Sequence, residues 1–263
     1  STIDRRLALA YGLYRPFEQR LLRRSQAVIA TSPSYLAASQ ALQPWRNRCV
    51  TIPLGLDPGR LQLPDPEGLV QALTLWGDAS LRVLAIGRLT YYKGHEVLIR
   101  ASASLPGVRT LIVGGGEYRQ RLERLIQTLN LDGSVQLTGY LSEAEIAALL
   151  ASCDLVCLPS LERTEAFGLV LLEAMRYAKP VVVSDIPGSG APWLVRRAQN
   201  GLLSHPGDVR SLAAALAELQ AHPERRQQLG VAGALALEQE FGIQPVAVAI
   251  GRLYGQVLGG SCR

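Results

Sequence analysis

From residue 82 onward, short apolar segments alternate with longer segments of helical periodicity, and this alternation restricts the possible fold most strongly. The expected strands are 82–87, 109–114, 134–138, 154–159, 180–184 and 201–204, with a helical pattern in each gap and after the last strand. Strands that are joined by helices run parallel, and the helices then cover both faces of the sheet. The sequence therefore predicts an α/β fold with a Rossmann-like, doubly wound parallel sheet.

The chain on either side of this region is organised differently. Residues 1–52 read as helix, strand, helix and strand, with the strands at 27–30 and 49–52. Proline and glycine crowd the following stretch, which is typical of a linker, here placed at residues 53–80. After the main domain, residues 81–241, one more helix is expected at 246–258, within a C-terminal segment 242–263.

Composition and charge exclude several classes of protein. With 48% hydrophobic and 19% charged residues, the chain can bury a core and is not expected to be disordered. It shows neither a signal-peptide pattern nor an apolar run near the ~20 residues of a membrane span. Cys49, Cys153, Cys157 and Cys262 lack zinc-site spacing and a disulfide framework, which favours a cytoplasmic location. The net charge of +5 comes without the basic stripe that nucleic-acid binding requires.

Much of the positive charge lies at the start of the chain. The arginines there are Arg5, Arg6, Arg15, Arg20, Arg23 and Arg24, interleaved with Tyr11, Tyr14, Phe17, Leu21 and Leu22. Two interpretations remain open: a surface for anionic lipid headgroups at the inner face of a membrane, or an ordinary amphipathic helix with a solvated basic face. The second is the simpler and is preferred on sequence alone.

Two glutamates stand eight residues apart around a predicted helix start. Glu165 precedes Phe167-Gly168, which reads as a turn, and Glu173 lies within the apolar helix that begins there. A carboxylate accepts two hydrogen bonds and so suits the paired hydroxyls of a ribose or a hexose. The free N–H groups of the helix N-terminus suit a phosphate. This segment could therefore bind the sugar, phosphate and ribose of one ligand. Taken alone, the pattern fits a solvated loop glutamate and a partly exposed helix glutamate better.

A basic pair follows the first strand of the predicted sheet. Arg88 and Lys93 lie in the loop between this strand and the next helix, where open α/β sheets bind ligands. The guanidinium fork and the ammonium point charge both suit phosphate oxygens. Together with the two glutamates, this pair is more consistent with a diphosphate site than with a solvated loop.

Two glycine-containing turns end the next two strands. Gly114 and Gly115 permit close approach of a ligand to the backbone, and Tyr140 with Leu141 follows the third strand. The turns do not match the G-x-G-x-x-G pattern, which disfavours a dinucleotide oxidoreductase. The sequence has no Asp-x-Asp motif for a divalent ion and its three histidines are scattered, so no metal is expected.

In combination these motifs resemble the retaining GT-B glycosyltransferases of family 4, the group 1 glycosyl transferases. The matching pieces are Gly87-Arg88-Leu89 with Lys93-Gly94, then 112–116, 139–142, 158–160, 165–173, 174–175 and 180–185, in the order of that family. The resemblance covers residues 80 to 240 and corresponds to the C-terminal, donor-binding domain of a two-domain enzyme. It implies that residues 1–52 are the remnant of the N-terminal, acceptor domain, and that the last helix returns toward that domain.

The resemblance also implies a function and a set of site residues. The expected activity is transfer of a sugar, with retention, from a nucleotide-diphospho-sugar to a glycan or lipid-linked acceptor in polysaccharide or glycolipid synthesis. Arg88 and Lys93 would neutralise the diphosphate and Glu165 would contact donor-sugar hydroxyls. The residues expected around the nucleotide are Glu173, Gly114, Gly115, Tyr140, Leu141, Phe167, Gly168 and Leu169. No cofactor is implied. This chain alone is expected to bind without transferring and to self-associate through residues 1–52 and the terminal helix.

One departure and two alternatives accompany this interpretation. Trp193 stands near the position where the family often has an acidic residue, which resembles mannosyl- and rhamnosyltransferases that use GDP-sugars, although Trp193 is equally suited to a core position. A nucleotide-sugar epimerase of the same fold and a non-catalytic nucleotide-binding domain remain open. A phosphorylase with a covalent cofactor is disfavoured, because the only lysines are Lys93 and Lys179.

Overall fold

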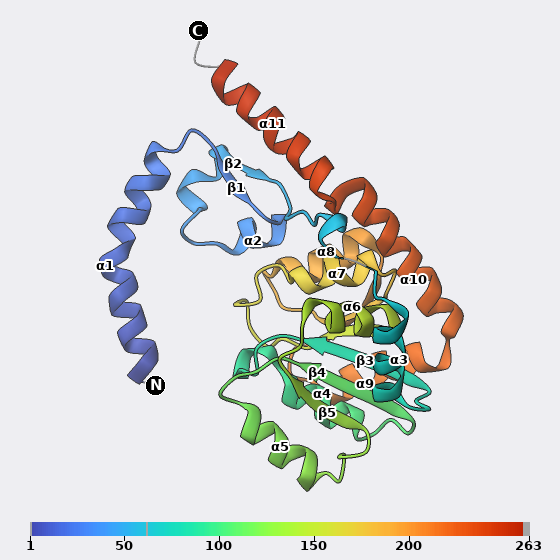
Figure 1. The fold of residues 1–263 in the computed structure, drawn as a ribbon. Helices are drawn as coiled ribbons and strands as arrows, with labels where there is room; N and C mark the ends of the chain where they lie inside the picture. Colours follow the sequence, from blue (N-terminus) through green and yellow to red (C-terminus); the bar gives the residue numbers. More distant parts are fainter. Residues whose placement is uncertain (1, 62, 260–263) are drawn as a thin grey trace.

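The computed structural model describes residues 2–61 and 63–259, and of residues 2–10 and 60 it describes the backbone only. Cys262, one of the four cysteines considered above, lies outside this range. Among the described residues, no helix has the length and apolar character needed to cross a membrane. The chain forms a large α/β domain, and a small α/β unit and a long C-terminal helix lie beside it (Figure 1).

A six-stranded, fully parallel sheet organises the large domain. Its strands are β3 (Leu81–Ile86), β4 (Val108–Val113), β5 (Val135–Gly139), β6 (Leu155–Leu158), β7 (Val181–Ser184) and β8 (Gly201–Ser204), in the spatial order β5-β4-β3-β6-β7-β8. Each predicted strand is present, with boundaries shifted by at most a few residues. The predicted doubly wound fold is confirmed.

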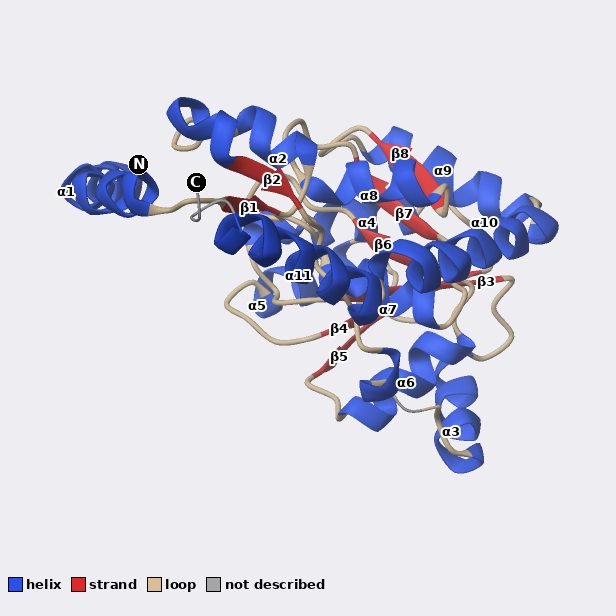
Figure 2. Ribbon diagram, turned by 90° about the horizontal axis from the view of Figure 1, so that it is seen from above, coloured by secondary structure: helices blue, strands red, loops and turns tan. Residues whose placement is uncertain are grey.

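Helices cover both faces of the sheet, as Figure 2 shows from above. On one face lie α3 (Pro66–Trp76), α6 (Glu143–Ser152), α7 (Leu169–Arg176) and α8 (Gly190–Ala198); on the other lie α4 (His95–Ser102), α5 (Arg119–Thr128) and α9 (Val209–Ala221). Side chains of neighbouring strand positions point to opposite faces, so Leu84 and Val83 enter different clusters. Strands that are covered on both sides must be apolar throughout, which explains the continuous apolar runs of the sequence.

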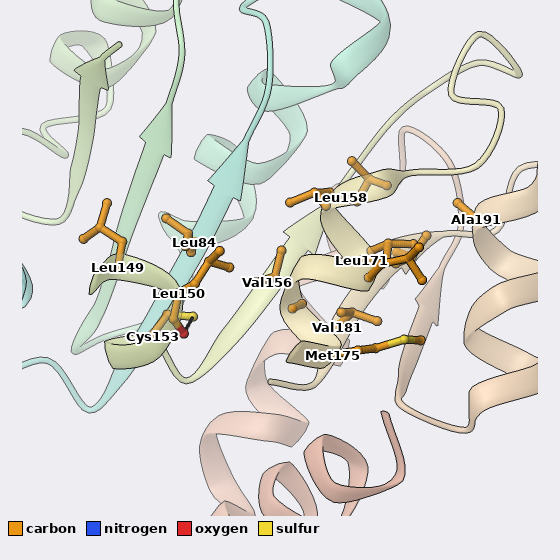
Figure 3. Close-up of a cluster of buried hydrophobic side chains, with 14 of the residues drawn as sticks. Leu84, Leu149, Leu150, Cys153, Val156, Leu158, Leu171, Met175, Val181 and Ala191 are labelled. Carbon is orange, nitrogen blue, oxygen red and sulfur yellow. Dashed lines mark hydrogen bonds between the residues drawn. The ribbon is translucent and has the colours of Figure 1, made fainter. Parts of the chain in front are cut away.

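The cluster under α6 and α7 is the larger of the two cores. Leu84, Val156 and Val181 point up from three strands toward Leu150, Cys153, Leu171 and Met175 of the covering helices (Figure 3). Cys153 and Cys157 are buried free thiols. Helix starts also follow the sequence: Ser142 and Glu145 form a capping box on α6, and Asp208 caps α9.

Part of the segment predicted as a linker is helical. Residues 66–76 form α3, capped by Asp65, and Trp76 is 1% exposed in the large core with its indole N–H donating to Ser152 Oγ at 2.9 Å. The proline and glycine content of 53–80 therefore marks the segment before this helix, whereas α3 packs on α6 as part of the large domain. Burial of an aromatic side chain outweighs weak local propensity here.

Residues 2–51 form the small unit. It comprises α1 (Thr2–Arg24), β1 (Val28–Ala30), α2 (Pro33–Ala38), the short 3₁₀ helix η1 (Gln43–Arg48) and β2 (Cys49–Thr51), with β1 and β2 parallel. A second 3₁₀ turn, η2 (Pro58–Arg60), precedes α3. The two strands leave Ile29 and Val50 exposed.

The chain ends in α10 (Pro223–Ala236), the π-helical turn η4 (Leu237–Phe241) and α11 (Ile243–Gly259). The backbone of Leu56 bonds to both Phe241 and Ile243, at 2.9 and 2.8 Å, which fixes the start of α11 to the segment after β2. Further along, Leu253 and Tyr254 of α11 line a cavity together with Ile29. The final helix therefore reaches the small unit.

Candidate functional site

The candidate site lies where the strand order reverses. Strand β3 pairs with β4 on one side and with β6 on the other, and the chain proceeds outward from this point in both directions. The two loops that leave the carboxyl ends of β3 and β6 separate here, and such a crevice is where open α/β sheets bind ligands. Arg88 and Lys93 are on the first loop and Glu165 is on the second.

Lys93 and Glu165, 72 positions apart in sequence, form an ion pair with 2.6 Å between Lys93 Nζ and Glu165 Oε2. Ser160 Oγ donates to the same carboxylate oxygen at 3.1 Å. The carboxylate is shielded from solvent, since Glu165 is only 8% exposed. Two residues that the sequence assigned to one site are thus in direct contact.

A glycine allows the two loops to meet. Gly94 ends the 3₁₀ turn η3 (Tyr91–Lys93) with a φ of 67°, and a Cβ there would lie 2.0 Å from the Pro159 carbonyl oxygen. Any other residue would push the β6 loop away from the β3 loop. The conformation at this position therefore sets the separation between Lys93 and the loop that carries Glu165.

The Glu165 loop is also fixed from the side of α8. The Ser189 hydroxyl caps α8 and donates to the Glu165 carbonyl oxygen, and Gly190 N–H donates to the Ala166 carbonyl at 2.7 Å. Ser189 is fully buried. The sequence analysis did not assign Ser160 or Ser189 to the site. The Ser189-Gly190 helix start is a recognisable cap pattern, but only the fold places it against Glu165.

Arg88 lies in the same loop as Lys93 but faces solvent. It makes none of the ion pairs found among the described residues. The adjacent Tyr92 hydroxyl raises the pKa of the Arg88 guanidinium, which is cationic in any case. An exposed, unpaired guanidinium beside the crevice is available to an anionic ligand.

The glycine turns after β4 and β5 have a structural function. Gly114 has a φ of 134°, and a Cβ there would lie 2.1 Å from the Gly87 carbonyl oxygen. Backbone bonds from Gly114 N–H to Gly139 and from Gly87 N–H to Val113 join the loops of three neighbouring strands. Gly115 lies against the ring of Tyr140, whose side chain is 83% exposed. These glycines permit the loops to approach one another; contact with a ligand stays a prediction.

The residues around the start of α7 differ in their accessibility. Gly168 is the N-cap and Leu169, the first helical residue, is 52% exposed. Phe167 is 4% exposed and packs in the core, so a ligand would meet its backbone rather than its ring. Leu141 likewise packs partly against the core. Glu173 is half-buried, and this burial raises the pKa of its carboxyl group.

Trp193 is placed in the core rather than in the site. It packs edge-on against Phe241, with ring centroids 5.9 Å apart and an interplanar angle of 80°. It is also partly buried against the cluster that contains Leu194 and Phe241. Its position favours the second of the two interpretations left open by the sequence.

His95 begins α4 directly behind the basic loop. It is 3% exposed, and neither imidazole nitrogen has a hydrogen-bond partner by the geometry of the described residues. Desolvation by burial, with a smaller contribution from the Lys93 charge, lowers the pKa of His95 to about 4. His95 is therefore neutral at physiological pH and adds no charge to the site.

This burial predicts a pH dependence of stability. In the unfolded chain this histidine has a pKa of about 6.5, so as the pH falls it is protonated there before it is protonated in the folded chain. The stabilisation of the fold by neutral His95 is therefore complete above about pH 6.5 and is lost as the pH falls toward 4. Over this range the free energy of unfolding should fall by about 3 kcal/mol. Urea denaturation at several pH values should show a flatter curve for His95→Leu than for the unchanged chain. His205→Leu, at an exposed site, is the control, and parallel curves for all three proteins would contradict the assignment.

Among the residues that the structure describes, there is no group of three or more His, Cys, Asp or Glu side chains that could hold a metal ion. The charged groups on the loops after β3 and β6 include instead the exposed guanidinium of Arg88, the ammonium of Lys93 and the carboxylate of Glu165. Cations at the end of a β-strand can bind a diphosphate, and carboxylates can accept hydrogen bonds from hydroxyls.

Comparison with known families agrees with this chemistry. The model of the glycosyl transferases group 1 family matches residues 74–235, more than half of the chain. The chain belongs to the group 1 glycosyl transferases. The match includes every residue that the sequence analysis assigned to the site, and it begins inside α3, which the structure places in the large domain.

Two relatives of the chain are named as transferases of a sugar. O-antigen chain mannosyltransferase C of Escherichia coli is 31% identical over 94% of this chain and 65% of its own length. D-rhamnosyltransferase WbpZ of Pseudomonas aeruginosa is 31% identical over 83% of this chain and 56% of its own length. The chain thus spans about three fifths of the length of these two relatives.

A solved structure confirms the fold. The crystal structure of Anabaena Alr3699/HepE in complex with UDP has a TM-score of 0.79 and 28% identity to this chain, and covers 89% of this chain and 65% of the Anabaena protein. The structural likeness extends into the small unit, because all of residues 53–263 together account for less than that share of the chain.

Proposed function

We propose that this chain is the donor-binding part of a retaining glycosyltransferase. It takes a nucleotide-diphospho-sugar, of the GDP-mannose or GDP-rhamnose type or a UDP-sugar, and the full enzyme transfers the sugar to a glycan or lipid-linked acceptor. The observation that carries the proposal is the Lys93–Glu165 pair at the reversal of strand order. One cation and one carboxylate held together at this point suit the diphosphate and the sugar of a single ligand.

The proposed roles follow from the geometry. Lys93 and the exposed Arg88 neutralise the charge that develops on the departing diphosphate, and this stabilisation is worth most in a partly desolvated crevice. Glu165 accepts hydrogen bonds from hydroxyls of the donor sugar. Glu173, which is half-buried and open to a partner, accepts from the ribose hydroxyls, while Leu169 begins the helix whose N–H groups face the phosphate.

The nature of the donor is supported only by the relatives. A mannosyltransferase and a rhamnosyltransferase among the relatives support mannose or rhamnose as the donor sugar, and the Anabaena complex supports UDP as the nucleotide. Because the chain spans 65% and 56% of the first two relatives, we assign the acceptor site to the part of the enzyme that the chain does not span. Positioning of two reactants requires both sides of the cleft, so we propose that this chain binds the donor without transferring the sugar.

Nucleotide binding to the 263-residue chain tests the proposal. A ligand at 100 times its Kd stabilises a fold by about 2.7 kcal/mol, which corresponds to a rise in melting temperature of roughly 5–10 °C. We expect a rise of this size with either GDP or UDP in thermal-shift measurements, and a much smaller one with ADP. Arg88→Gln should abolish most of the shift.

The matched control is Arg100→Gln, an exposed arginine on α4 outside the crevice, which should shift as the unchanged chain does. No shift with any nucleotide in a folded sample would favour the non-catalytic alternative. A normal shift followed by release of an epimerised sugar nucleotide from the full-length enzyme would favour the epimerase.

A further inference from the structure

The loop that carries Glu165 contains a tight turn directly before this residue. The Glu165 N–H donates to the Glu162 carbonyl oxygen at 3.0 Å, so Arg163 and Thr164 occupy the two central positions of the turn. The three residues before Glu165 are exposed, whereas Glu165 itself is buried. Contacts that fix the tip of this turn therefore also fix the backbone from which the Glu165 side chain reaches Lys93.

Arg163 joins the tip of the turn to the small unit. Its guanidinium donates at 3.2 Å to the carbonyl oxygen of Ala38, which lies 125 positions earlier in the chain. The same guanidinium lies over the ring of Tyr35, 5.8 Å from the centroid, within the range of a cation–π interaction. Both partners belong to α2, and Ala38 is its last residue, where helix carbonyl groups are free to accept from a cation.

Two glycines around the start of α8 allow α2 to approach this turn. Gly188 has a φ of 75°, and a Cβ there would lie 2.5 Å from the Ala38 Cβ and 3.2 Å from the Arg163 Nε. A Cβ on Gly190 would lie 3.0 Å from the Oγ of Ser32, which is fully buried and caps α2. Figure 1 shows α2 beside α8, with which it is in contact. The small unit thus packs on the helix start that already holds the loop after β6.

We propose that Arg163 is a positioning residue, which anchors the turn to α2 and so holds the Glu165 carboxylate in place for the hydroxyls of the donor sugar. The anchors of the loop at Ser189 and at the Gly94 contact lie within the large domain, whereas the anchor at Arg163 comes from the small unit. Sugar binding at Glu165 therefore depends on a contact between the two parts of the chain. This role for Arg163 rests on the proposed function, because it acts through the sugar-binding role of Glu165.

Loss of the anchor should affect the sugar and spare the nucleotide. One hydrogen bond and one cation–π contact are together sufficient to change the population of an exposed turn several-fold. When only a fraction of the molecules holds the loop in its binding position, the apparent affinity falls by that fraction. The groups proposed to bind the nucleoside diphosphate are Arg88, Lys93 and Glu173, which lie outside the turn.

Isothermal titration calorimetry on the 263-residue chain tests this role, with UDP-glucose and GDP-mannose compared with UDP and GDP. Arg163→Ala should weaken binding of the sugar nucleotide about fivefold and change that of the matching nucleoside diphosphate by less than about twofold. Tyr35→Leu should weaken sugar-nucleotide binding about threefold in the unchanged chain but add nothing to Arg163→Ala, since both changes remove the same contact.

Two further variants separate positioning from a general effect on the fold. Arg163→Lys keeps a cation near the Tyr35 ring and a donor toward Ala38, so it should restore sugar-nucleotide affinity to within about twofold of the unchanged chain. Arg100→Ala, at an exposed arginine on α4, removes the same charge elsewhere and should alter neither affinity. Equal losses of sugar-nucleotide and nucleoside diphosphate affinity in Arg163→Ala, or additive losses with Tyr35→Leu, would overturn the proposal, because Arg163 would then contact the ligand itself.

Amide hydrogen exchange of the ligand-free chain, followed by NMR, gives a readout that needs no nucleotide. The Glu165 amide, which is bonded to the Glu162 carbonyl, should exchange about fivefold faster in Arg163→Ala and in Tyr35→Leu, while the amides of α9 should exchange as in the unchanged chain. An unchanged exchange rate of the Glu165 amide would overturn the proposal. If the unchanged chain bound no sugar nucleotide, the proposed function would fail, and the exchange rates would still decide whether Arg163 holds the turn.

Discussion

Replacing Lys93 by methionine is expected to lower the free energy of unfolding by about 3 kcal/mol, even in the absence of any nucleotide. The Lys93 ammonium is 2.6 Å from the Glu165 carboxylate, which is 8% exposed and also accepts a hydrogen bond from Ser160. Methionine fills similar volume but leaves this shielded carboxylate without a counter-charge, and an uncompensated buried charge is costly. Urea denaturation of the ligand-free chain measures the loss.

A double-mutant cycle separates this charge effect from lost packing. In the Glu165→Gln background the same Lys93→Met change should cost about 1 kcal/mol or less, because no buried charge is left behind. Lys179→Met, at the other lysine of the chain, is the control and should also cost little. A Lys93→Met loss that persists in the double variant would show that the pair is not what stabilises these two loops.

The fold could be predicted from the sequence because the local signals agreed with one another. The strands of the sheet are apolar on both faces, their spacing leaves room for one crossover helix each, and residues such as Ser142 and Asp208 start helices where the fold needs them. Helix α3 was not predicted from the sequence, and the cause is clear. Its neighbourhood is rich in proline, and only the burial of Trp76 against α6, a tertiary contact, fixes the helix.

The site was only partly predictable. The end of each strand is a local property, so Arg88, Lys93 and Glu165 could be assigned to ligand loops from the sequence. The direct contact between Lys93 and Glu165 depends on the adjacency of β3 and β6 and on the close approach at Gly94, which no local pattern reveals. Ser189 was missed for the same reason. Gly114 was assigned to the ligand, whereas its conformation is already required by contact with Gly87.

Substitutions of the two glutamates of the site are expected to have clearly different effects on nucleotide affinity. Glu173→Ala should weaken binding of the nucleoside diphosphate that gives the largest thermal shift by about 100-fold, since two hydrogen bonds to a carboxylate are lost at roughly 1.5 kcal/mol each. Burial raises the pKa of Glu173, so affinity should also decline with falling pH sooner than an ordinary glutamate would cause. Isothermal titration calorimetry measures both effects.

Glu165→Gln should instead leave nucleoside diphosphate affinity unchanged or raise it a few-fold, while it weakens binding of the complete sugar nucleotide. In the ligand-free chain Glu165 holds the Lys93 ammonium at 2.6 Å, and a diphosphate must compete with this carboxylate for the same cation. Glutamine removes the competing charge but also an acceptor for the sugar hydroxyls. The control is Glu224→Gln at an exposed helix start, which should alter neither affinity. Equal weakening of nucleoside diphosphate binding by Glu165→Gln and Glu173→Ala would indicate that both carboxylates contact the nucleotide itself. The assignment of one glutamate to the sugar and the other to the ribose would then be wrong.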